Sequence, residues 1–257
     1  MGLWTVEHVI TILPAFVIFI GIAILVGWLL RDKSEKIRRI PLQVIAVILI
    51  GLEIAKQIEA GIGGYDLYAL PFHYCSLFLY LLPLHAFIGG RFRKYVNAAT
   101  LGCLASLFFF MLVMPAIVYS EYNIIDFFGS FGSFHTVTFH NLVILYFVLT
   151  LSLKLYEFNI KRDLSVMAIF LAIYVVIATV LSHTLKTNFH NLYKCNLAPV
   201  EDIRLMMVDK LGWFGQAIYV AVLFILTIIF AYIAYFLCYL VLKLIETVKA
   251  RICKKES

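Results

Sequence analysis

The chain has 257 residues, of which 63% are hydrophobic and 14% are charged, and its mean hydropathy is +0.98. A soluble domain has about 45–50% apolar and about 25% charged residues, so this composition excludes an ordinary soluble protein and indicates an integral membrane protein. The formal net charge of +6 would suit a nucleic-acid-binding protein, but the distribution of the basic residues, described below, excludes that class.

Apolar runs of the length of a membrane-spanning helix, about 20 residues, follow one another along the chain. They cover residues 8–30, 41–60, 70–89, 96–118, 134–155, 165–185 and 213–242. Because a helix satisfies its own backbone hydrogen bonds in lipid, we expect an all-α, polytopic transmembrane helix bundle of about seven spans. It forms a single domain over 1–257. The first run lacks a basic n-region and a cleavage site, so we expect a retained span rather than a signal peptide.

Lysine and arginine residues set the expected orientation. Sixteen of the 21 lie in the segments 31–40, 91–95, 154–163 and the tail from 243, which all fall on one side of a seven-span chain. The positive-inside rule then places the N-terminus outside and the C-terminus in the cytoplasm. We therefore expect a multi-pass protein of the cell membrane, with lipids rather than nucleic acid as the partners of its basic residues.

The longest segment expected outside is 186–212. Within it, Pro199 suits the first position of a short helix that ends at Leu211. Ile203, Met206 and Met207 would give this helix an apolar face. We expect it to lie on the outer leaflet or to cover a cavity.

Most of the histidines fall on the expected outer side. His73 opens the third span, His135 and His140 open the fifth, and His183 closes the sixth, with Asn188 just beyond. Glu53 and Lys56, three residues apart on one face of the second span, lie in its outer half. An ionisable group within a span is costly and marks a functional site by default, so these residues predict a polar cavity open to the outer leaflet. Histidines that only contact lipid headgroups, and a structural Glu53–Lys56 ion pair, are the alternatives.

Cys75 is the candidate nucleophile of this cavity. If Pro71 begins the third helix, His73 lies about 200° around that helix from Cys75 and points to its far side. The base would then come from another span, with His140 or His135 as candidates. A cysteine paired with a histidine is the arrangement that carries acyl transfer through a thioester. The alternative is that Cys75 packs as a small buried apolar residue.

Two other roles for these residues are open. A metal site would use histidine and carboxylate ligands, but the sequence contains no HxxxH, HxxH or HExxH spacing, so we expect no metal and no cofactor. A disulfide between Cys75 and Cys195 would be chemically allowed at an oxidising face, and it would preclude a catalytic thiol.

Several stretches resemble a known family. The run ALPFHYCSLFLYLLPL is similar to the LPLHLC stretch of the YwaF-like bacterial integral membrane proteins, and FHNLVILYFVLTL, TNFHNLYKC and LGWFGQAIYV resemble later segments of that family. Its members look related to eukaryotic TMEM-type phospholipid acyltransferases. The resemblance implies that Cys75 accepts the acyl group and that His140 is its histidine. The segment 186–212 departs from the family pattern.

The sequence therefore predicts a membrane-embedded lipid acyltransferase or acyl hydrolase that acts on a phospholipid or acyl substrate at the outer leaflet. Cys75, His140 and His135 would be catalytic, and the supporting residues would be His73, Glu53, Lys56, His183 and Asn188. The alternative is a transporter or small-ligand receptor that uses the same polar residues as a binding pocket.

Overall fold

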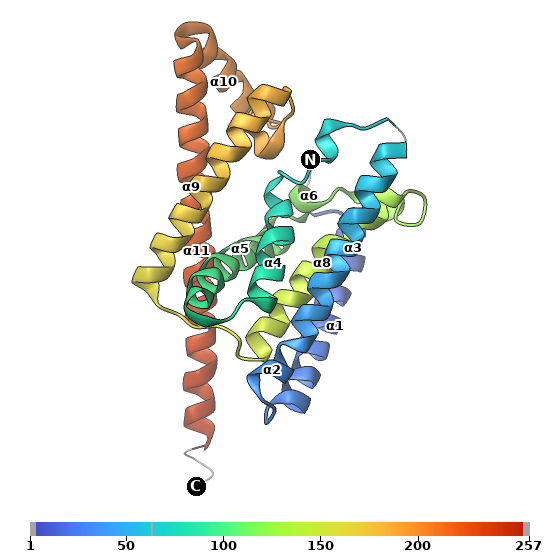
Figure 1. Cartoon of the computed structure of the whole chain (residues 1–257), viewed down its shortest axis with the longest axis vertical. Coiled ribbons are helices and arrows are strands. Elements are labelled where there is room, and N and C mark those ends of the chain that lie inside the picture. The colour runs from blue at the N-terminus through green and yellow to red at the C-terminus, as the bar shows by residue number, and fades with distance from the viewer. Residues whose placement is uncertain (1–3, 63, 254–257) are drawn as a thin grey trace.

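The computed structural model describes residues 4–62 and 64–253, and every regular element in these ranges is helical (Figure 1). The α-helices and 3-10 helices (η) are α1 (Val6–Leu30), α2 (Glu35–Arg38), α3 (Ile40–Ile62), η1 (Leu67–Ala69), η2 (Tyr74–Ser76), α4 (Leu77–Phe87), η3 (Gly90–Phe92), α5 (Arg93–Val113), α6 (Pro115–Val118), α7 (Glu121–Ile125), α8 (Phe131–Ser152), α9 (Ile160–Leu185), η4 (Phe189–Asn191), α10 (Ala198–Leu211) and α11 (Trp213–Cys253). The all-α prediction is confirmed.

Five helices in the described ranges are long and apolar enough to cross a membrane. They are Val6–Leu30, Gly90–Val113, Phe131–Ser152, Ile160–Leu185 and Trp213–Val248. Apolar side chains on α1 and α11 are widely exposed, as expected of helices in contact with membrane lipids. The protein is therefore a multi-pass membrane protein. Neither α3 nor the shorter Tyr74–Phe87 is among the five, so a total of seven spans stays a prediction.

The helix expected to begin at Pro71 begins instead at Tyr74. Leu70 and His73 have extended backbone angles, with ψ of 139° and 159°. Leu70 precedes Pro71, and a residue before proline is driven out of the helical region. Two tyrosine hydroxyls satisfy carbonyls of this non-helical stretch. Tyr80 donates to the Pro71 carbonyl at 3.2 Å and Tyr174 donates to the Phe72 carbonyl at 2.9 Å. Irregular backbone at membrane depth is tolerated where protein groups satisfy it in this way.

Proline also divides the helix expected over 96–118. The α5 helix ends at Val113, and Met114, which precedes Pro115, has φ of −140° and ψ of 60°. A short helix, α6, then starts at Pro115, where a proline at the first position is favourable. The chain turns here, so that Tyr119 is buried against the beginning of α1.

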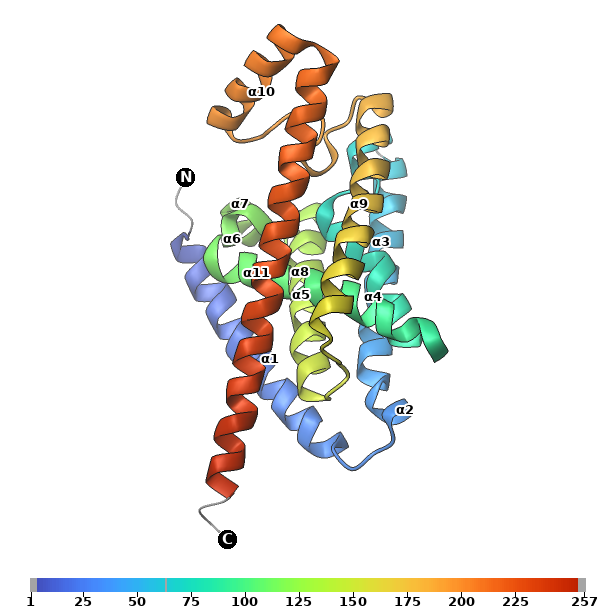
Figure 2. The same cartoon turned by 90° about the vertical axis from the view of Figure 1, so that its left-hand side faces the viewer.

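The helix α5 forms the centre of the bundle. It contacts α4, α8, α9 and α11, and most of its residues between Asn97 and Leu107 are buried. Two groups of helices lie on either side of it: α1 and α3 pack against α8, and α9 packs with α11. Figure 2 shows α9 and α11 beside each other along their length, with α10 folded back on the start of α11.

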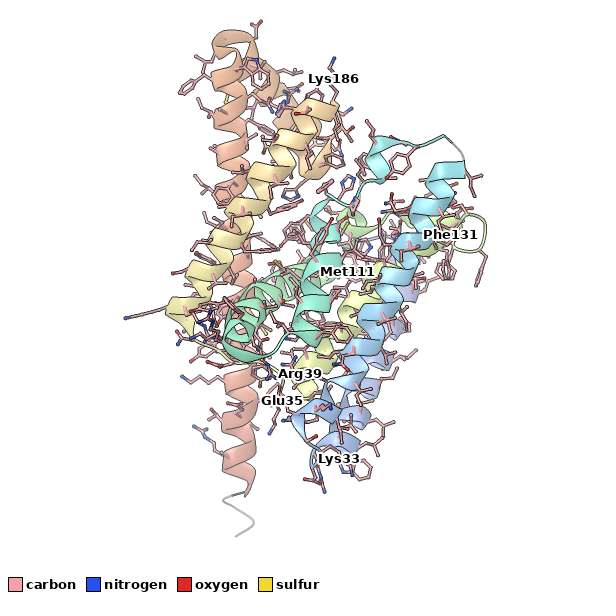
Figure 3. All side chains as sticks on the ribbon, in the orientation of Figure 1. Lys33, Glu35, Arg39, Met111, Phe131 and Lys186 are labelled. Carbon is pink, nitrogen blue, oxygen red and sulfur yellow. The ribbon has the colours of Figure 1, made fainter. Side chains whose placement is uncertain are left out.

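The bundle has two chemically distinct ends. The basic end is formed by residues 31–39, 90–94 and 153–163, together with the later part of α11. The histidine end is the opposite one, where α1 and α8 begin and α9 finishes. Figure 3 shows Lys33, Glu35 and Arg39 at the basic end, Lys186 at the other, and the buried Met111 between them. The predicted cytoplasmic placement of the basic end stays a prediction.

Candidate functional site

Cys75 lies in the 3-10 turn η2, which leads into α4. His73 is the residue that precedes this turn, and its backbone is extended. His73 and Cys75 therefore do not share a helix, and the prediction that His73 points to the far side of a helix from Cys75 is wrong. His73 Nε2 is bonded to the Tyr68 carbonyl at 3.0 Å, and its ring packs edge-on against Phe189 at a centroid distance of 5.4 Å.

The side chain of Tyr74 joins this turn to η4. Its ring stacks on His190, with centroids 5.2 Å apart and the planes at 23°. Tyr174 of α9 contacts both rings, at 6.5 Å from Tyr74 and 5.9 Å from His190. His190 is thus the histidine whose ring contacts the turn that carries Cys75.

An unusual backbone places His190 in this position. His190 and Asn191 both have left-handed angles, with φ of 49° and 58°, which non-glycine residues adopt only where the surrounding structure holds them. Asn188 supplies part of that support, because its side-chain oxygen accepts from the backbone N–H groups of Tyr193 and Lys194 at 3.3 and 3.1 Å. The Tyr219 hydroxyl donates to the Asn191 carbonyl at 2.7 Å. Asn188 therefore positions the loop rather than facing Cys75.

His190 is half-buried and its ring forms no hydrogen bond within the described residues. Its Nε2 atom is buried and has no partner among the described residues. Burial lowers the pKa of His190 to about 4, so the ring is neutral at pH 7 and one of its nitrogens is free to accept a proton. A buried nitrogen without a partner is costly and points to an absent ligand or to a chemical role.

His190 and Tyr74 also line an apolar cavity of about 400 Å³. The other side chains that line it come from α5 and α11 and include Phe110, Leu226 and Phe230. The cavity is in the size range of ligand pockets, about 300–1,000 Å³, and has the usual combination of an apolar wall with a few polar groups. Its composition suits an acyl chain.

Glu53 is the centre of a second polar group, between α3 and α8. Its carboxylate pairs with Lys56 Nζ at 2.9 Å, accepts from Gln57 Nε2 at 2.6 Å, and lies 3.6 Å from His135 Nε2. Gln57 also donates to the Ala69 carbonyl at 2.8 Å, which ties α3 to the segment before η2. The structure therefore brings Glu53, Lys56 and His135 together, next to the segment that leads to Cys75.

His140 belongs to a different environment. Its Nδ1 is bonded to the Thr136 carbonyl at 2.7 Å, and its ring lies 6.1 Å from that of Tyr119. His8, fully buried, contacts the same tyrosine through a 3.0 Å bond from Nε2 to the Tyr119 carbonyl. In the described ranges, the Cys75 sulfur forms no hydrogen bond with His140 or His135.

His183 lies apart from Cys75, in a polar group shared by α9, α10 and α11. Its Nε2 is 3.4 Å from Gln216 Nε2, and Arg204 donates to Gln216 Oε1 at 2.8 Å. Arg204 also forms a two-point ion pair with Glu201, and Glu201 accepts from the Cys195 backbone N–H at 2.6 Å. These contacts hold the α10 segment onto α11.

The thiols of Cys75 and Cys195 are both free. The disulfide that would have precluded a catalytic thiol is not formed in the structure. Over 4–62 and 64–253, no group of three or more His, Cys, Asp or Glu side chains is arranged to hold a metal ion.

The sequence reasoning missed His190, Tyr74 and Tyr174 as members of this site. The stretch TNFHNLYKC did single out the segment, but no sequence signal reports that a histidine will adopt a left-handed backbone. The aromatic residues of the site sit in apolar runs, where the sequence gives no reason to separate them from core residues.

Comparison with known proteins gives one result. The sequence model of the TMEM164 family matches residues 3–236, nearly the whole chain. No curated protein and no solved structure gives a significant match.

Proposed function

The chain belongs to the TMEM164 family, and on that premise we propose that it is a membrane-embedded lipid acyltransferase or acyl hydrolase that carries the acyl group on Cys75. One observation supports this most. The free Cys75 thiol shares a turn with Tyr74, whose ring stacks on the unpaired His190 at the wall of an apolar cavity of about 400 Å³. A closer kinship with the YwaF-like bacterial proteins, from the LPFHYC stretch, is part of the proposal.

The proposed reaction has two balanced steps. The Cys75 sulfur attacks the carbonyl carbon of a phospholipid ester, a carbon–sulfur bond forms, and the ester carbon–oxygen bond breaks. The thiol proton passes to a histidine and from there to the leaving lysophospholipid oxygen. The hydroxyl of a second lysophospholipid, or water, then attacks the thioester carbonyl carbon, a carbon–oxygen bond forms, the carbon–sulfur bond breaks, and the proton of the attacking group returns to the Cys75 sulfur. The first acceptor gives acyl transfer and the second gives hydrolysis.

Two histidines compete for the role of base. The family resemblance favours His140, with His135 as the other candidate on α8. The contacts favour His190, because its ring lies against the turn that carries Cys75 and its Nε2 has no other partner in the described chain. We propose His190 as the base, and His73 as a residue that fixes the start of the turn.

Lys56 and Glu53 would stabilise negative charge in the site and would not transfer protons. Lys56 Nζ is held by the carboxylate of Glu53 at 2.9 Å, and Gln57, one residue further on, is bonded to the segment that leads to Cys75. A fixed cation favours the thiolate over the thiol, and it also stabilises the oxyanion that forms during attack. His135, 3.6 Å from Glu53, would help to orient that carboxylate.

The test uses the full chain in phospholipid vesicles with a fluorescent acyl chain on phosphatidylcholine and a lysophospholipid acceptor. We expect a labelled protein adduct that hydroxylamine releases, and we expect Cys75→Ser to abolish both the adduct and turnover. Cys238→Ser is the matched control, since Cys238 is a free thiol in the part of α11 toward the basic end. If the wild-type protein forms no adduct and turns over no phospholipid, the proposal is wrong.

A second comparison separates the two histidines. His190→Gln should lower turnover by about 100-fold or more, the usual contribution of a general base, whereas His140→Gln should leave most of the activity. The opposite order would return the role of base to His140 and leave the Cys75 proposal intact.

A further inference from the structure

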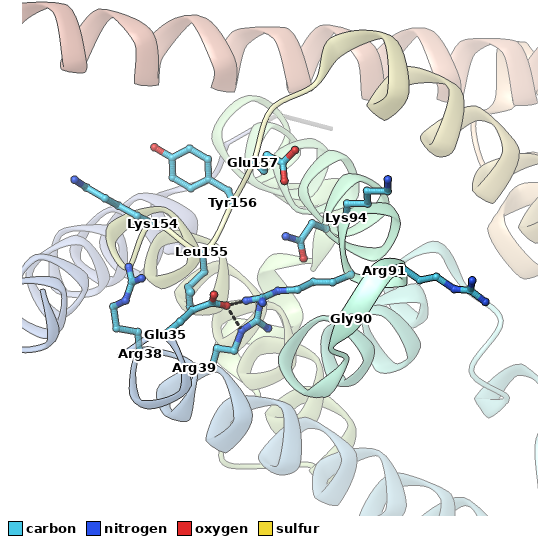
Figure 4. Close-up of a pocket in the computed structure, with 12 residues that line it drawn as sticks. Glu35, Arg38, Arg39, Gly90, Arg91, Lys94, Lys154, Leu155, Tyr156 and Glu157 are labelled. Carbon is cyan, nitrogen blue, oxygen red and sulfur yellow. Dashed lines mark hydrogen bonds and ion pairs between the residues drawn. The ribbon is translucent and has the colours of Figure 1, made fainter. Parts of the chain in front are cut away.

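The basic end of the bundle contains a cationic cavity that the proposed reaction does not use. Its volume is about 370 Å³, and it lies between the α2–α3 segment, the start of α5 and residues 154–157 (Figure 4). Six of the side chains that line it are cationic: Arg38, Arg39, Arg91, Arg93, Lys94 and Lys154. Two are anionic, Glu35 and Glu157, so the lining has an excess of positive charge.

The two carboxylates are already paired with arginines. Glu35 pairs with Arg39 at 2.8 Å and also with Arg93. Glu157 pairs at 3.0 Å with Arg162, which is outside the cavity. In the described chain, Arg38, Arg91, Lys94 and Lys154 therefore have no carboxylate partner.

Two arginines in the lining hold buried donors without acceptors. Arg39 is only 7% exposed, and its Nη2 atom has no hydrogen-bond partner, although its Nη1 donates to the His85 carbonyl at 2.6 Å. The buried Nε of Arg38 is also without a partner, while its Nη1 donates to the Leu153 carbonyl at 2.7 Å. Both guanidinium groups are thus held in place, and each keeps a buried N–H group without an acceptor. Such N–H groups can donate to the oxygens of a phosphate.

The cationic cavity meets an apolar groove. This groove has a volume of about 800 Å³ and is lined by α1, α5, α8 and α11, mainly with aliphatic and aromatic side chains. Lys154 and Tyr156 line both spaces. A phosphate in the cavity would therefore lie next to a groove that suits acyl chains. A soluble phosphate would occupy the cationic cavity but would leave the apolar groove empty.

From this juxtaposition we propose that the basic end binds one anionic phospholipid, with its phosphate in the Arg38–Arg39 cavity and its acyl chains in the groove beside Trp28. The arrangement is distinct from the general attraction of surface lysines to anionic lipids, because it has fixed buried donors and a contiguous apolar groove. It does not depend on the acyl transfer proposed at Cys75.

The test reads the groove directly through Trp28, which lines it. The Trp4→Phe, Trp213→Phe form of the full chain leaves Trp28 as the remaining one of three tryptophans. It is placed in vesicles that carry bromine atoms on the acyl chains of phosphatidylglycerol or of phosphatidylcholine, at equal mole fractions. We expect Trp28 to be quenched more strongly by the brominated phosphatidylglycerol.

Variants that remove positive charge then test whether the cavity is the source of the preference for phosphatidylglycerol. Lys94→Gln with Lys154→Asn should lower the preference for phosphatidylglycerol by about 25-fold, since each basic residue near a membrane surface contributes about a fivefold factor. Asparagine is chosen at 154 because Lys154 has a left-handed φ of 53°, which asparagine tolerates. The matched control is Lys33→Gln with Lys36→Gln, two exposed lysines at the same end that do not line the cavity.

Three results would overturn the proposal. Equal quenching by the two brominated lipids would show no anionic site. An equal loss in both double variants would show surface attraction only. Loss of the preference in inorganic phosphate, but not in sodium chloride of equal ionic strength, would show a site for a soluble phosphate. If the Lys94, Lys154 variant does not fold, the exposed Lys94→Gln alone should still weaken the preference by about fivefold.

Discussion

Tyr235 of α11 and Asp163 of α9 are joined by a buried hydrogen bond, in which the tyrosine hydroxyl donates to Oδ2 at 2.6 Å. Asp163 is fully buried, and it also accepts from Arg162 Nε at 2.7 Å and from the Asn159 backbone N–H at 2.8 Å. The carboxylate therefore links the start of α9 to the middle of α11.

Tyr235→Phe should lower the free energy of unfolding by about 1–3 kcal/mol, because it removes a donor from a buried charged acceptor. Tyr239→Phe is the control, since the Tyr239 hydroxyl has no hydrogen bond in the described chain and its ring contact with Phe158 is retained. Denaturant unfolding of both variants in one detergent gives the comparison. Equal midpoints for the two variants would contradict the assigned role.

A second buried pair joins α4 to α8. His85 Nδ1 and the Tyr146 hydroxyl are 2.7 Å apart, and both residues are almost fully buried. Tyr146→Phe should lower the free energy of unfolding by about 1–3 kcal/mol, because the imidazole loses its partner. Tyr95→Phe, at an exposed site without a hydroxyl bond in the described ranges, should change it by less than about 0.5 kcal/mol. A stable Tyr146→Phe protein would show that His85 serves packing alone.

The close approach of α10 to α11 depends on Gly215. A methyl group added there would collide with the backbone carbonyl of Met207, which cannot rotate away. Gly215→Ala should therefore displace α10 and cost about 1–3 kcal/mol. Gly21→Ala, where nothing lies within 4 Å of the added carbon, is the control and should be neutral or slightly stabilising. Hydrogen exchange of the α10 amides should quicken only in the first variant.

Acid should release α10 through Glu201. Hydrogen bonding by Arg204 is the main reason that the pKa of Glu201 is below its ordinary value. The stability from this pair is thus fully present above about pH 4.3, the ordinary value for glutamate. It is lost as the pH falls through the lower folded value.

At pH 7, Glu201→Gln should therefore speed exchange of the α10 amides by about two- to fivefold, the range for a partly exposed ion pair. In acid the variant and the wild type should converge. Asp202→Asn, at an exposed position on the same helix, is the matched control and should follow the wild type throughout. A constant difference between Glu201→Gln and wild type at all pH values would contradict the ion-pair explanation.

The fold class could be predicted because it depends on the average hydropathy and the length of each apolar run. Long apolar runs predict spanning helices whatever their detailed packing, and this holds for α1, α5, α8, α9 and α11. The start of α4 could not be predicted in the same way. Pro71 suits the first position of a helix as well as it suits the extended stretch that the structure shows. The tyrosines that satisfy this stretch come partly from another helix, and one sequence does not reveal that pairing.

The candidate site was predicted in part. The structure places Glu53, Lys56 and His135 together. Glu53 and Lys56 are three residues apart on one helix, and the sequence places His135 at the same end of its own span, so their proximity agrees with the sequence pattern. His190 was not identified, because its position depends on two left-handed residues and on the side chain of Asn188. The resemblance directed attention to His140, whose contacts lie around Tyr119 instead. The roles of these residues in catalysis stay predictions.

The helix α11 has 41 residues and contains no proline. At about 1.5 Å per residue it is about 60 Å long, whereas a bilayer with its headgroups is about 40–45 Å thick. Its ends therefore stand outside the bilayer or the helix is steeply tilted. One end carries α10 and the other continues past the basic end (Figure 1). A continuous helix resists compression along its axis, so α11 joins α10 to the basic end of the bundle through one rigid element.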